Sequence, residues 1–467
     1  MEKKEHKKCP AQRDASHKKN WREVYATVED IQRFLGDQMM LRYNVITRRV
    51  ECHLLNRSPW DSYDGSEESA MDLLMAIAEQ QSPGSGKEEP MLWRPVTDRL
   101  VNSLWKDLSK EKPVRAQDIY RVLESDFVPE FHPFRHYLEH LPPWDGGSDH
   151  ILAMSASVRV KGGVAEQMRF YEYLKKWLVA MVAGWIDEGV VNNVILVLIG
   201  EQGSYKTTWF NYLLPPELKQ YFFTKTNARR MDRDDLLTLA QYALVCCEEL
   251  DTMKSSELNQ LKAAVTMPAI DERAAYAHFH EHRPHIASFC GTGNTVQFLS
   301  DATGNRRWLP FEVESIDSPR EHPFDYAGIY AQAYGLYRQG FRYWFSQDDI
   351  RRLSAHNETY EAPNLERDLI QKYFRHPKDD EHGEYLSATE IMQAVGGSIV
   401  QKLNANKIAN AMKALGYEPR RSNGRRGYLV VAYKPEEIEM NRRMLAYDAR
   451  SVAEGNSDTS DASDTTF

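Results

Sequence analysis

The sequence has no segment that could span a membrane and no sign of an export signal. Its longest apolar helical run, Trp177–Ile186, falls far short of the roughly 20 residues that a membrane-spanning helix requires. Residues 1–20 are charged, with no apolar segment behind them, so we expect no signal peptide. The five cysteines are an odd number and form no CxxC pair, which favours free thiols in a reducing compartment over disulfides or zinc ligands. These features predict a soluble cytoplasmic protein that makes no contact with membranes.

An excess of basic charge is also missing, since the net charge is −9 over 467 residues. This balance excludes a uniformly basic nucleic-acid-binding surface but leaves room for local basic patches. The first 130 residues hold no convincing carboxylate set for a primase-type polymerase, because the loop between Asp61 and Asp64 is more typical of a solvated turn. Hydrophobic residues make up 42% of the chain, which is enough for large cores in about three domains.

Residues 191–210 hold the pattern around which the rest of the chain is arranged. The unbroken aliphatic run Val194–Ile199 is typical of a strand buried on both faces of a parallel sheet, and a glycine-containing loop and a predicted helix follow it. In this context backbone N–H groups bind phosphates, Lys206 neutralises their charge and the Thr207 hydroxyl reaches Mg²⁺. The predicted ATP-binding residues are Gly200, Gly203, Ser204, Tyr205, Lys206, Thr207 and Thr208.

One position departs from the phosphate-loop pattern G-x-x-x-x-G-K-[ST]. Tyr205 stands where the pattern has glycine, and a Cβ can obstruct the close approach of the backbone to phosphate. We expect Gly203 to supply the flexibility instead, with the Tyr205 ring pointing out of the loop. The alternative is an ordinary strand, turn and helix with an incidental lysine.

Acidic residues follow the next apolar run, Tyr242–Cys247, about forty residues after the lysine. A phosphate-loop enzyme needs one carboxylate to support Mg²⁺ and another to orient or deprotonate the attacking water. We assign the first role to Glu248 and the second to Glu249, with Asp251 as a substitute for either. The alternative is an acidic turn at the end of a strand.

A third apolar run, His285–Cys290, ends in Gly-Thr-Gly and Asn294. Three such strands with polar residues at their carboxyl ends predict a nucleotide-binding α/β sheet. Asn294 fits a polar sensor beside the γ-phosphate, although it is also a common turn residue. Arg306 and Arg307 fit an arginine finger or, equally, a surface pair.

Histidines gather just before the third strand and at its first residue, at positions 278, 280, 282 and 285. No cysteine lies nearby to complete a zinc site, and Arg273 and Arg283 flank the group. We therefore predict a loop that contacts nucleic acid through Arg273, His280 and His282, or a plain solvated hairpin.

Five motifs in this order resemble the virulence-associated protein E (VirE/VapE) family, over about residues 130–315. They are Pro-Phe-Arg to Trp-Asp-Gly (133–146), the loop at 200–208, Glu-Leu-Asp (249–251), Gly-Thr-Gly-Asn (291–294) and Thr-Gly-Asn-Arg-Arg-Trp-Leu-Pro (303–310). Members of this family are P-loop ATPases of phages and mobile elements, similar to superfamily 3 helicases and phage primase-helicases.

The resemblance implies an AAA+-like ATPase that forms hexamers and acts on DNA. It makes Lys206 and Thr207 the P-loop pair, Glu249 the Walker B carboxylate, Asn294 the sensor and Arg306 or Arg307 the finger. It also makes Asp271–His285 the loop that enters the ring pore and touches DNA. Tyr205 departs from the family pattern, and without a polymerase domain no primer synthesis is expected.

The C-terminal third predicts a winged helix. Helices at 388–395 and 404–415 are followed by a strand from Gly416, a turn at 422–425 and a returning strand at 427–432. Six basic residues and one acid lie between positions 404 and 428, which favours DNA over a protein partner. The predicted nucleic-acid contacts here are Lys407, Arg420, Arg421, Arg425 and Arg426.

The predicted fold is α/β, with a P-loop NTPase core between an N-terminal helical adaptor and a C-terminal winged helix. The predicted parts are a disordered basic arm (1–20), an α+β or helical adaptor (21–130), the ATPase domain (131–350, with a helical lead-in at 131–190 and an α/β core at 191–315), the winged helix (362–434) and an extension with an acidic disordered tail (435–467). The predicted function is an ATP- and Mg²⁺-dependent motor on single-stranded or forked DNA, working as a homo-oligomer such as a hexameric ring. A nucleotide-switched DNA-binding regulator and a weakly hydrolysing NTPase that is not a helicase stay open as alternatives.

Overall fold

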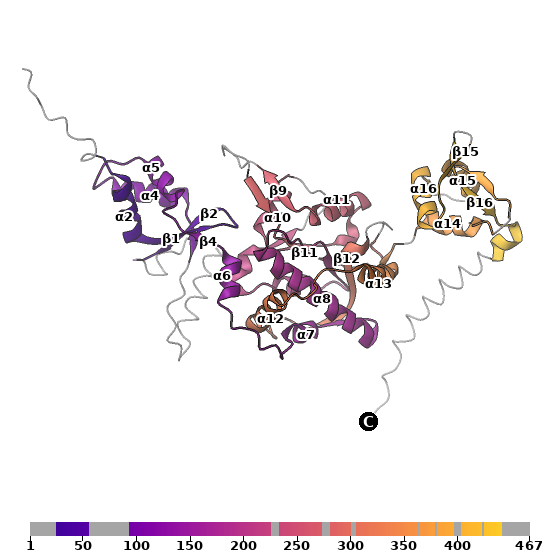
Figure 1. The fold of residues 1–467 in the computed structure, drawn as a ribbon, viewed down its shortest axis with the longest axis horizontal. Helices are drawn as coiled ribbons and strands as arrows, with labels where there is room; N and C mark the ends of the chain where they lie inside the picture. Colours follow the sequence, from indigo (N-terminus) through magenta and orange to yellow (C-terminus); the bar gives the residue numbers. More distant parts are fainter. Residues whose placement is uncertain are drawn as a thin grey trace, which may run out of the picture.

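The structure is a computed structural model that describes residues 25–55, 93–225, 233–272, 281–299, 305–362, 364–378, 381–396, 403–422 and 425–440. The described residues form an N-terminal, a central and a C-terminal part, which Figure 1 shows in chain order from indigo to yellow. The basic arm predicted for residues 1–20 lies outside the described residues, as does the tail from residue 441 onward.

The N-terminal part is a four-stranded sheet with helices packed on it. The strands lie in the order β3 (Arg94–Pro95), β2 (Arg49–Leu54), β1 (Met39–Asn44) and β4 (Glu130–Phe131). The helices are α2 (Val28–Gln38), α4 (Asp98–Leu108) and α5 (Ala116–Leu123). Thr27 and Asp30 form a capping box that starts α2, and Ile31 and Leu35 of this helix enter the core. The sheet makes this part α+β rather than purely helical.

The central part is built on a six-stranded sheet. Its order is β5 (Val158–Val160), β12 (Trp308–Ile316), β6 (Ile195–Ile199), β11 (Ser288–Gly293), β8 (Leu244–Cys247) and β7 (Phe222–Lys225). The strands from β12 to β7 are parallel, and β5 pairs antiparallel with β12. The three apolar strands predicted from the sequence are confirmed, but β11 is displaced along the chain and continues past the predicted end at Cys290 through Gly-Thr-Gly.

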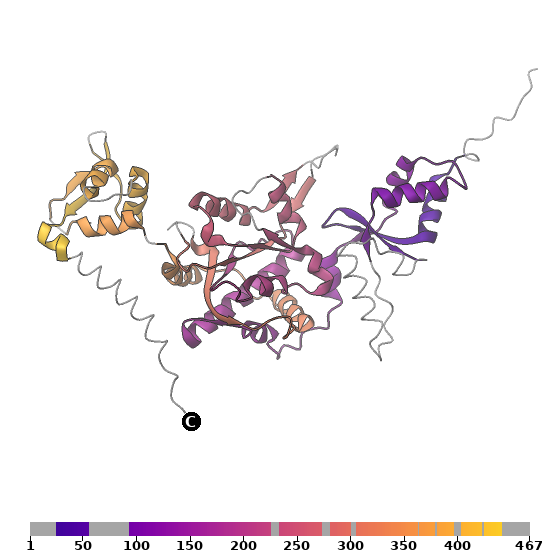
Figure 2. The same cartoon turned by 180° about the vertical axis from the view of Figure 1, so that it is seen from behind.

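Helices cover both faces of this sheet, which explains why its central strands have no polar face (Figures 1 and 2). Leu196 and Leu198 of β6 point into one core, and Ile195, Val197 and Ile199 point into the other. The first core includes residues of α6 (Pro133–Glu139), α7 (His150–Ser155), α8 (Gly163–Ile186), α12 (Tyr326–Arg338) and α13 (Gln347–Asn357). The second includes residues of α10 (Arg233–Gln241) and α11 (Ser255–Val265).

The tip of the β1–β2 hairpin joins the N-terminal part to the central part. Ile46 belongs to the larger central core. The buried Asn44 side chain donates hydrogen bonds to the Tyr221 hydroxyl and to Glu51 Oε1, both over 2.7 Å. Arg48 donates to the His282 carbonyl over 3.2 Å. These contacts fix the hairpin tip against the central part.

The C-terminal part contains α14 (Leu365–Tyr373), β13 (Phe374–Arg375), β14 (Glu384–Leu386), α15 (Ala388–Val395), α16 (Ala405–Ala414), β15 (Arg420–Ser422) and β16 (Arg425–Ala432). Strand β16 pairs antiparallel with β13, β14 and β15. The predicted helices and returning strand are confirmed, whereas the strand expected from Gly416 begins only at Arg420. Gly416 has a left-handed backbone (φ +82°) and closes α16 instead. The name winged helix stays a prediction.

Among the residues with described positions, no helix is long and apolar enough to cross a bilayer.

Candidate active site

The carboxyl ends of the parallel strands meet at one edge of the central sheet. Ile199 of β6 pairs with Gly293 of β11, and Gly291 pairs with Cys247 of β8. The Gly200 N–H also donates to the Gly293 carbonyl over 3.1 Å. The loop after β6, the acidic turn after β8 and Asn294 after β11 therefore emerge together, where α/β sheets bind ligands. The sequence-predicted residues from these three segments are brought together here.

The loop between β6 and α9 (Lys206–Asn211) contains two left-handed residues, Gly203 (φ +87°) and Tyr205 (φ +60°). The expectation that Gly203 would take over the special backbone conformation from Tyr205 is therefore only half right. A non-glycine residue pays about 1 kcal/mol for this conformation. Tyr205 is 49% exposed, and the outward direction of its ring stays a prediction.

Lys206 begins α9 and turns its side chain back into the loop. Its ammonium group donates to the carbonyls of Gly200 (2.8 Å) and Glu201 (2.6 Å) and to Ser204 Oγ (3.2 Å). Burial lowers the pKa of Lys206, and the negative charge of Asp251 opposes this shift. The carbonyls that hold this buried ammonium group are neutral and leave its charge uncompensated. Binding of an anion in their place is therefore favourable. Thr207 and Thr208 lie half-buried in the first turn of α9.

The acidic turn after β8 places its three carboxylates differently. Glu248 is half-buried, and Glu249 is exposed and has a left-handed backbone (φ +53°). The chain then forms the short helix η3 (Leu250–Thr252). Asp251 Oδ2 accepts the Thr295 N–H over 3.1 Å, while Oδ1 is buried and accepts no hydrogen bond from any described residue. The roles of Glu248 and Glu249 stay predictions.

The Glu-Leu-Asp and Gly-Thr-Gly motifs form one structural unit. A Cβ on Gly291 would lie 2.3 Å from Leu250 Cδ1 and 3.0 Å from the Cys247 carbonyl oxygen. A Cβ on Gly293 would lie 3.4 Å from Asp251 Oδ1. Both glycines face η3, so their lack of side chains lets the acidic turn lie directly against the end of β11.

Arg306 and Arg307 lie at the opposite end of the strands, where the parallel strands begin. They form η4 (Asn305–Arg307) just before β12, whose first residue, Trp308, pairs with Ile195 at the amino end of β6. The length of β6, about 3.3 Å per residue, separates them from the loop by roughly 15 Å. Arg306 is exposed and Arg307 half-buried. The structure does not bring either arginine to the other candidate residues of the same chain.

The histidine-rich segment begins and ends as a two-stranded antiparallel ribbon, β9 (Ala269–Glu272) with β10 (Glu281–Pro284). His282 Nδ1 lies 2.7 Å from Asp271 Oδ1. His285 is buried against the Met267 carbonyl, and burial lowers its pKa. Arg273, His278 and His280 lie outside the described residues. Of the described His, Cys, Asp and Glu side chains, no three gather as a metal site would.

The four arginines of the C-terminal ribbon lie exposed on β15 and β16. Arg421 stands directly opposite Arg426, and Ser422 opposite Arg425. Like charges in opposite positions repel each other, so this ribbon favours a bound anion. Lys407 on α16 lies 3.9 Å from Glu366, in an ion pair that leaves its side chain 70% exposed.

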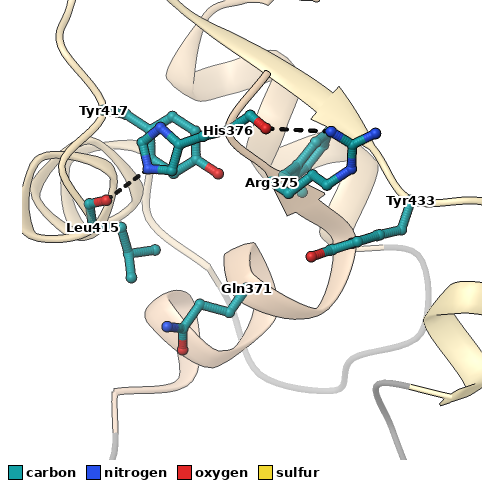
Figure 3. A pocket seen from close by; sticks show the side chains of 7 residues that line it. Gln371, Arg375, His376, Leu415, Tyr417 and Tyr433 are labelled. Carbon is teal, nitrogen blue, oxygen red and sulfur yellow. Dashed lines mark hydrogen bonds between the residues drawn. The ribbon is translucent and has the colours of Figure 1, made fainter. Parts of the chain in front are cut away.

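A cavity of about 300 Å³ lies at the far end of β16 from the arginines, and sequence reasoning missed it (Figure 3). The His376 ring stacks on Tyr417 at 3.8 Å, and its Nε2 lies 2.9 Å from the Leu415 carbonyl. Arg375 forms a two-point ion pair with Glu381. These contacts bring together residues from before α15 and after α16, which no local pattern indicates.

Residues 144–362 match the sequence model of the virulence-associated protein E-like domain. The chain carries a virulence-associated protein E-like domain. The resemblance drawn from the motifs is thereby confirmed. The VapE-like domain includes the loop after β6, the acidic turn, Asn294 and both arginines of η4.

Solved structures of the NrS-1 C-terminal region are similar over much of their length. One apo structure, of residues 305–718, has 11% sequence identity and a TM-score of 0.44, and covers 86% of this chain and 98% of that chain. Two A-form apo structures give 11% and 10% identity with TM-scores of 0.43 and 0.44. TM-scores this low do not establish a shared fold. No curated protein matches the sequence.

Proposed function

We propose that this chain is an ATP-dependent motor that acts on DNA during replication of a phage or mobile element. The observation that carries the proposal is the loop after β6, where the buried Lys206 ammonium group is held by its own loop at the edge where β8 and β11 also end. Such an edge suits a phosphate chain, which would take the place of the Gly200 and Glu201 carbonyls.

Each residue at this edge has a role in the proposed reaction. Lys206 neutralises the phosphates, and the backbone N–H groups at the start of α9 donate to them. Glu249, exposed beside the edge, orients or deprotonates the attacking water, and Asn294 donates to the γ-phosphate. Bound Mg²⁺ would neutralise charge that develops on the phosphates, and the Thr207 hydroxyl and a carboxylate of the acidic turn are the oxygen ligands at hand.

The proposed DNA contacts come from two separate surfaces. The arginines of β15 and β16 repel one another across the ribbon, and phosphates of a DNA backbone would relieve this repulsion. The β9–β10 ribbon projects from the central part (Figure 1), and Arg273 and His280 lie between its two strands in the sequence. A motor needs a DNA contact whose position depends on the bound nucleotide. After β10 ends at Pro284, the chain continues directly into β11, which ends at the proposed ATP site.

The first test is ATP hydrolysis by the full chain, with and without single-stranded DNA. We expect DNA-stimulated turnover that falls at least a hundredfold in Lys206→Ala, which removes the charge on the phosphates, and likewise in Glu249→Gln, which removes the group that activates the attacking water. Glu257→Gln, in the first turn of α11, is the matched control and should keep full turnover. Turnover equal to that of Lys206→Ala under both conditions would contradict the motor.

A nucleotide-switched DNA-binding regulator is the second candidate. Tyr205 has a strained, left-handed backbone in the loop, and a strained loop suits a switch between two states better than efficient hydrolysis. Such a protein would bind one duplex sequence without nucleotide and hydrolyse ATP weakly. Replacing Arg425 and Arg426 together with alanine would then weaken its duplex binding. A third outcome, hydrolysis that responds to a partner protein and displaces no strand, would indicate an NTPase that is not a helicase.

A further inference from the structure

One carboxylate oxygen of Asp251 accepts a hydrogen bond, and the other has no hydrogen-bond partner among the described residues. Oδ2 accepts the Thr295 N–H over 3.1 Å, whereas Oδ1 is buried and accepts no hydrogen bond within the described chain. A buried polar atom without a partner costs about 1–3 kcal/mol, and more when it is charged. Proteins keep such atoms mainly where a ligand, ion or water satisfies them during function.

The unpaired oxygen lies beside the proposed ATP site. It is 3.4 Å from the position of a Cβ on Gly293, whose carbonyl accepts the Gly200 N–H at the start of the loop. The charge of Asp251 also acts on Lys206. The position of Oδ1 beside Gly293 therefore places this carboxylate toward the loop, and its effect on the pKa of Lys206 agrees with that position.

The backbone of the acidic turn explains why Asp251 takes this position and the two glutamates do not. The left-handed residue Glu249 reverses the chain, so that η3 folds back over Gly291 and Gly293. Glu249 itself remains exposed. Glu248 precedes this reversal and emerges from β8, one strand further from β6 than β11 is.

We propose that Asp251, rather than Glu248, is the carboxylate that positions the hydrated Mg²⁺ of bound ATP, through its unpaired Oδ1. Mg²⁺ in proteins keeps several waters and uses one or two carboxylates together with substrate phosphates, so a single such oxygen is sufficient. Through Oδ2 the same side chain holds Thr295, next to Asn294, and thereby links the metal to the end of β11. The inference rests on the proposed binding of ATP but not on DNA or on hydrolysis.

The test measures binding of a non-hydrolysable ATP analogue to the full chain, at increasing Mg²⁺ and in EDTA. Asp251→Asn keeps the shape and an acceptor for Thr295 but removes the charge. We expect it to raise the Mg²⁺ concentration needed for half-maximal binding about tenfold, as loss of a partner to metal-bound water does. Affinity in EDTA should stay equal or rise slightly, because one negative charge near the phosphates is gone. Glu248→Gln tests the rival assignment and should leave the Mg²⁺ requirement unchanged, as should the control Glu257→Gln in the first turn of α11.

Three outcomes would overturn the proposal. A raised Mg²⁺ requirement in Glu248→Gln but not in Asp251→Asn would give the role to Glu248. Equal losses of affinity with Mg²⁺ and in EDTA would show that Asp251 acts only through the fold. A wild-type chain that binds no analogue would overturn this inference and the proposed function together, whereas binding without hydrolysis would contradict only the motor.

Discussion

At the scale of single residues, Tyr205 shows that a broken motif need not mean a broken loop. Its backbone has the left-handed conformation for which glycine is the usual residue, and its ring is half exposed. The obstruction expected from a Cβ at this position is therefore a matter of strain in the backbone. This strain costs about 1 kcal/mol in the ligand-free loop, so ligand binding adds no further strain at this position.

This reasoning gives a prediction for ATP binding. Tyr205→Gly should change the affinity for an ATP analogue by less than about threefold, because the backbone already has the required form. Tyr205→Val should weaken it about fivefold or more, since a β-branched residue resists positive φ. Equilibrium binding by the full chain measures both. A tenfold gain in Tyr205→Gly would mean that the tyrosine does obstruct the phosphates.

At the scale of elements, helix α6 depends on a histidine cap that titrates. The Arg135 N–H donates to His132 Nδ1 over 3.3 Å, and this bond needs the neutral ring. Burial, with a smaller effect from Arg135, lowers the pKa of His132 to about 4. An unfolded histidine has a pKa of about 6.5. The stability contributed by the neutral ring is therefore complete above about pH 6.5 and is lost as the pH falls toward 4.

Urea unfolding followed by tryptophan fluorescence at pH 7.5 and pH 5 tests this dependence. Wild type should lose about 1 kcal/mol more between the two pH values than His132→Asn, a figure already reduced for the partial exposure of the ring. Asparagine caps the helix equally well and does not titrate. Equal losses in the two proteins would show that His132 has an ordinary pKa.

The elements also show how far a single sequence predicts this structure. Strands β6 and β8 could be predicted because their residues are all apolar and lie between two helical layers. The end of β11 could not, since Gly-Thr-Gly has the composition of a turn and only its pairing with β6 makes it a strand. The candidate edge was predictable because parallel strands end together, but the position of Asp251 depends on the left-handed Glu249. The contact of Asn44 with Tyr221 joins residues too far apart in sequence for any pattern to show it.

At the scale of the whole molecule, one chain holds an incomplete set of the expected catalytic groups. The loop, the acidic turn and Asn294 meet at one edge of the sheet, while Arg306 and Arg307 lie at the opposite edge, roughly 15 Å away. An arginine finger in this protein would therefore act on the site of a neighbouring copy. This geometry favours a head-to-tail assembly, which closes into a ring when the rotation permits.

Mixing two inactive variants tests this arrangement. Arg306→Ala combined with Arg307→Ala should abolish ATP turnover, and so should Lys206→Ala, because each assembly lacks one half of every shared site. In an equal mixture that has exchanged subunits, about a quarter of the contacts join an intact loop to an intact arginine pair, so about a quarter of wild-type turnover should return. Arg320→Ala, beyond the end of β12, is the matched control and should keep full turnover alone. No recovery in a mixture with demonstrated subunit exchange, or full turnover by the double arginine variant, would show that these arginines serve no neighbouring site.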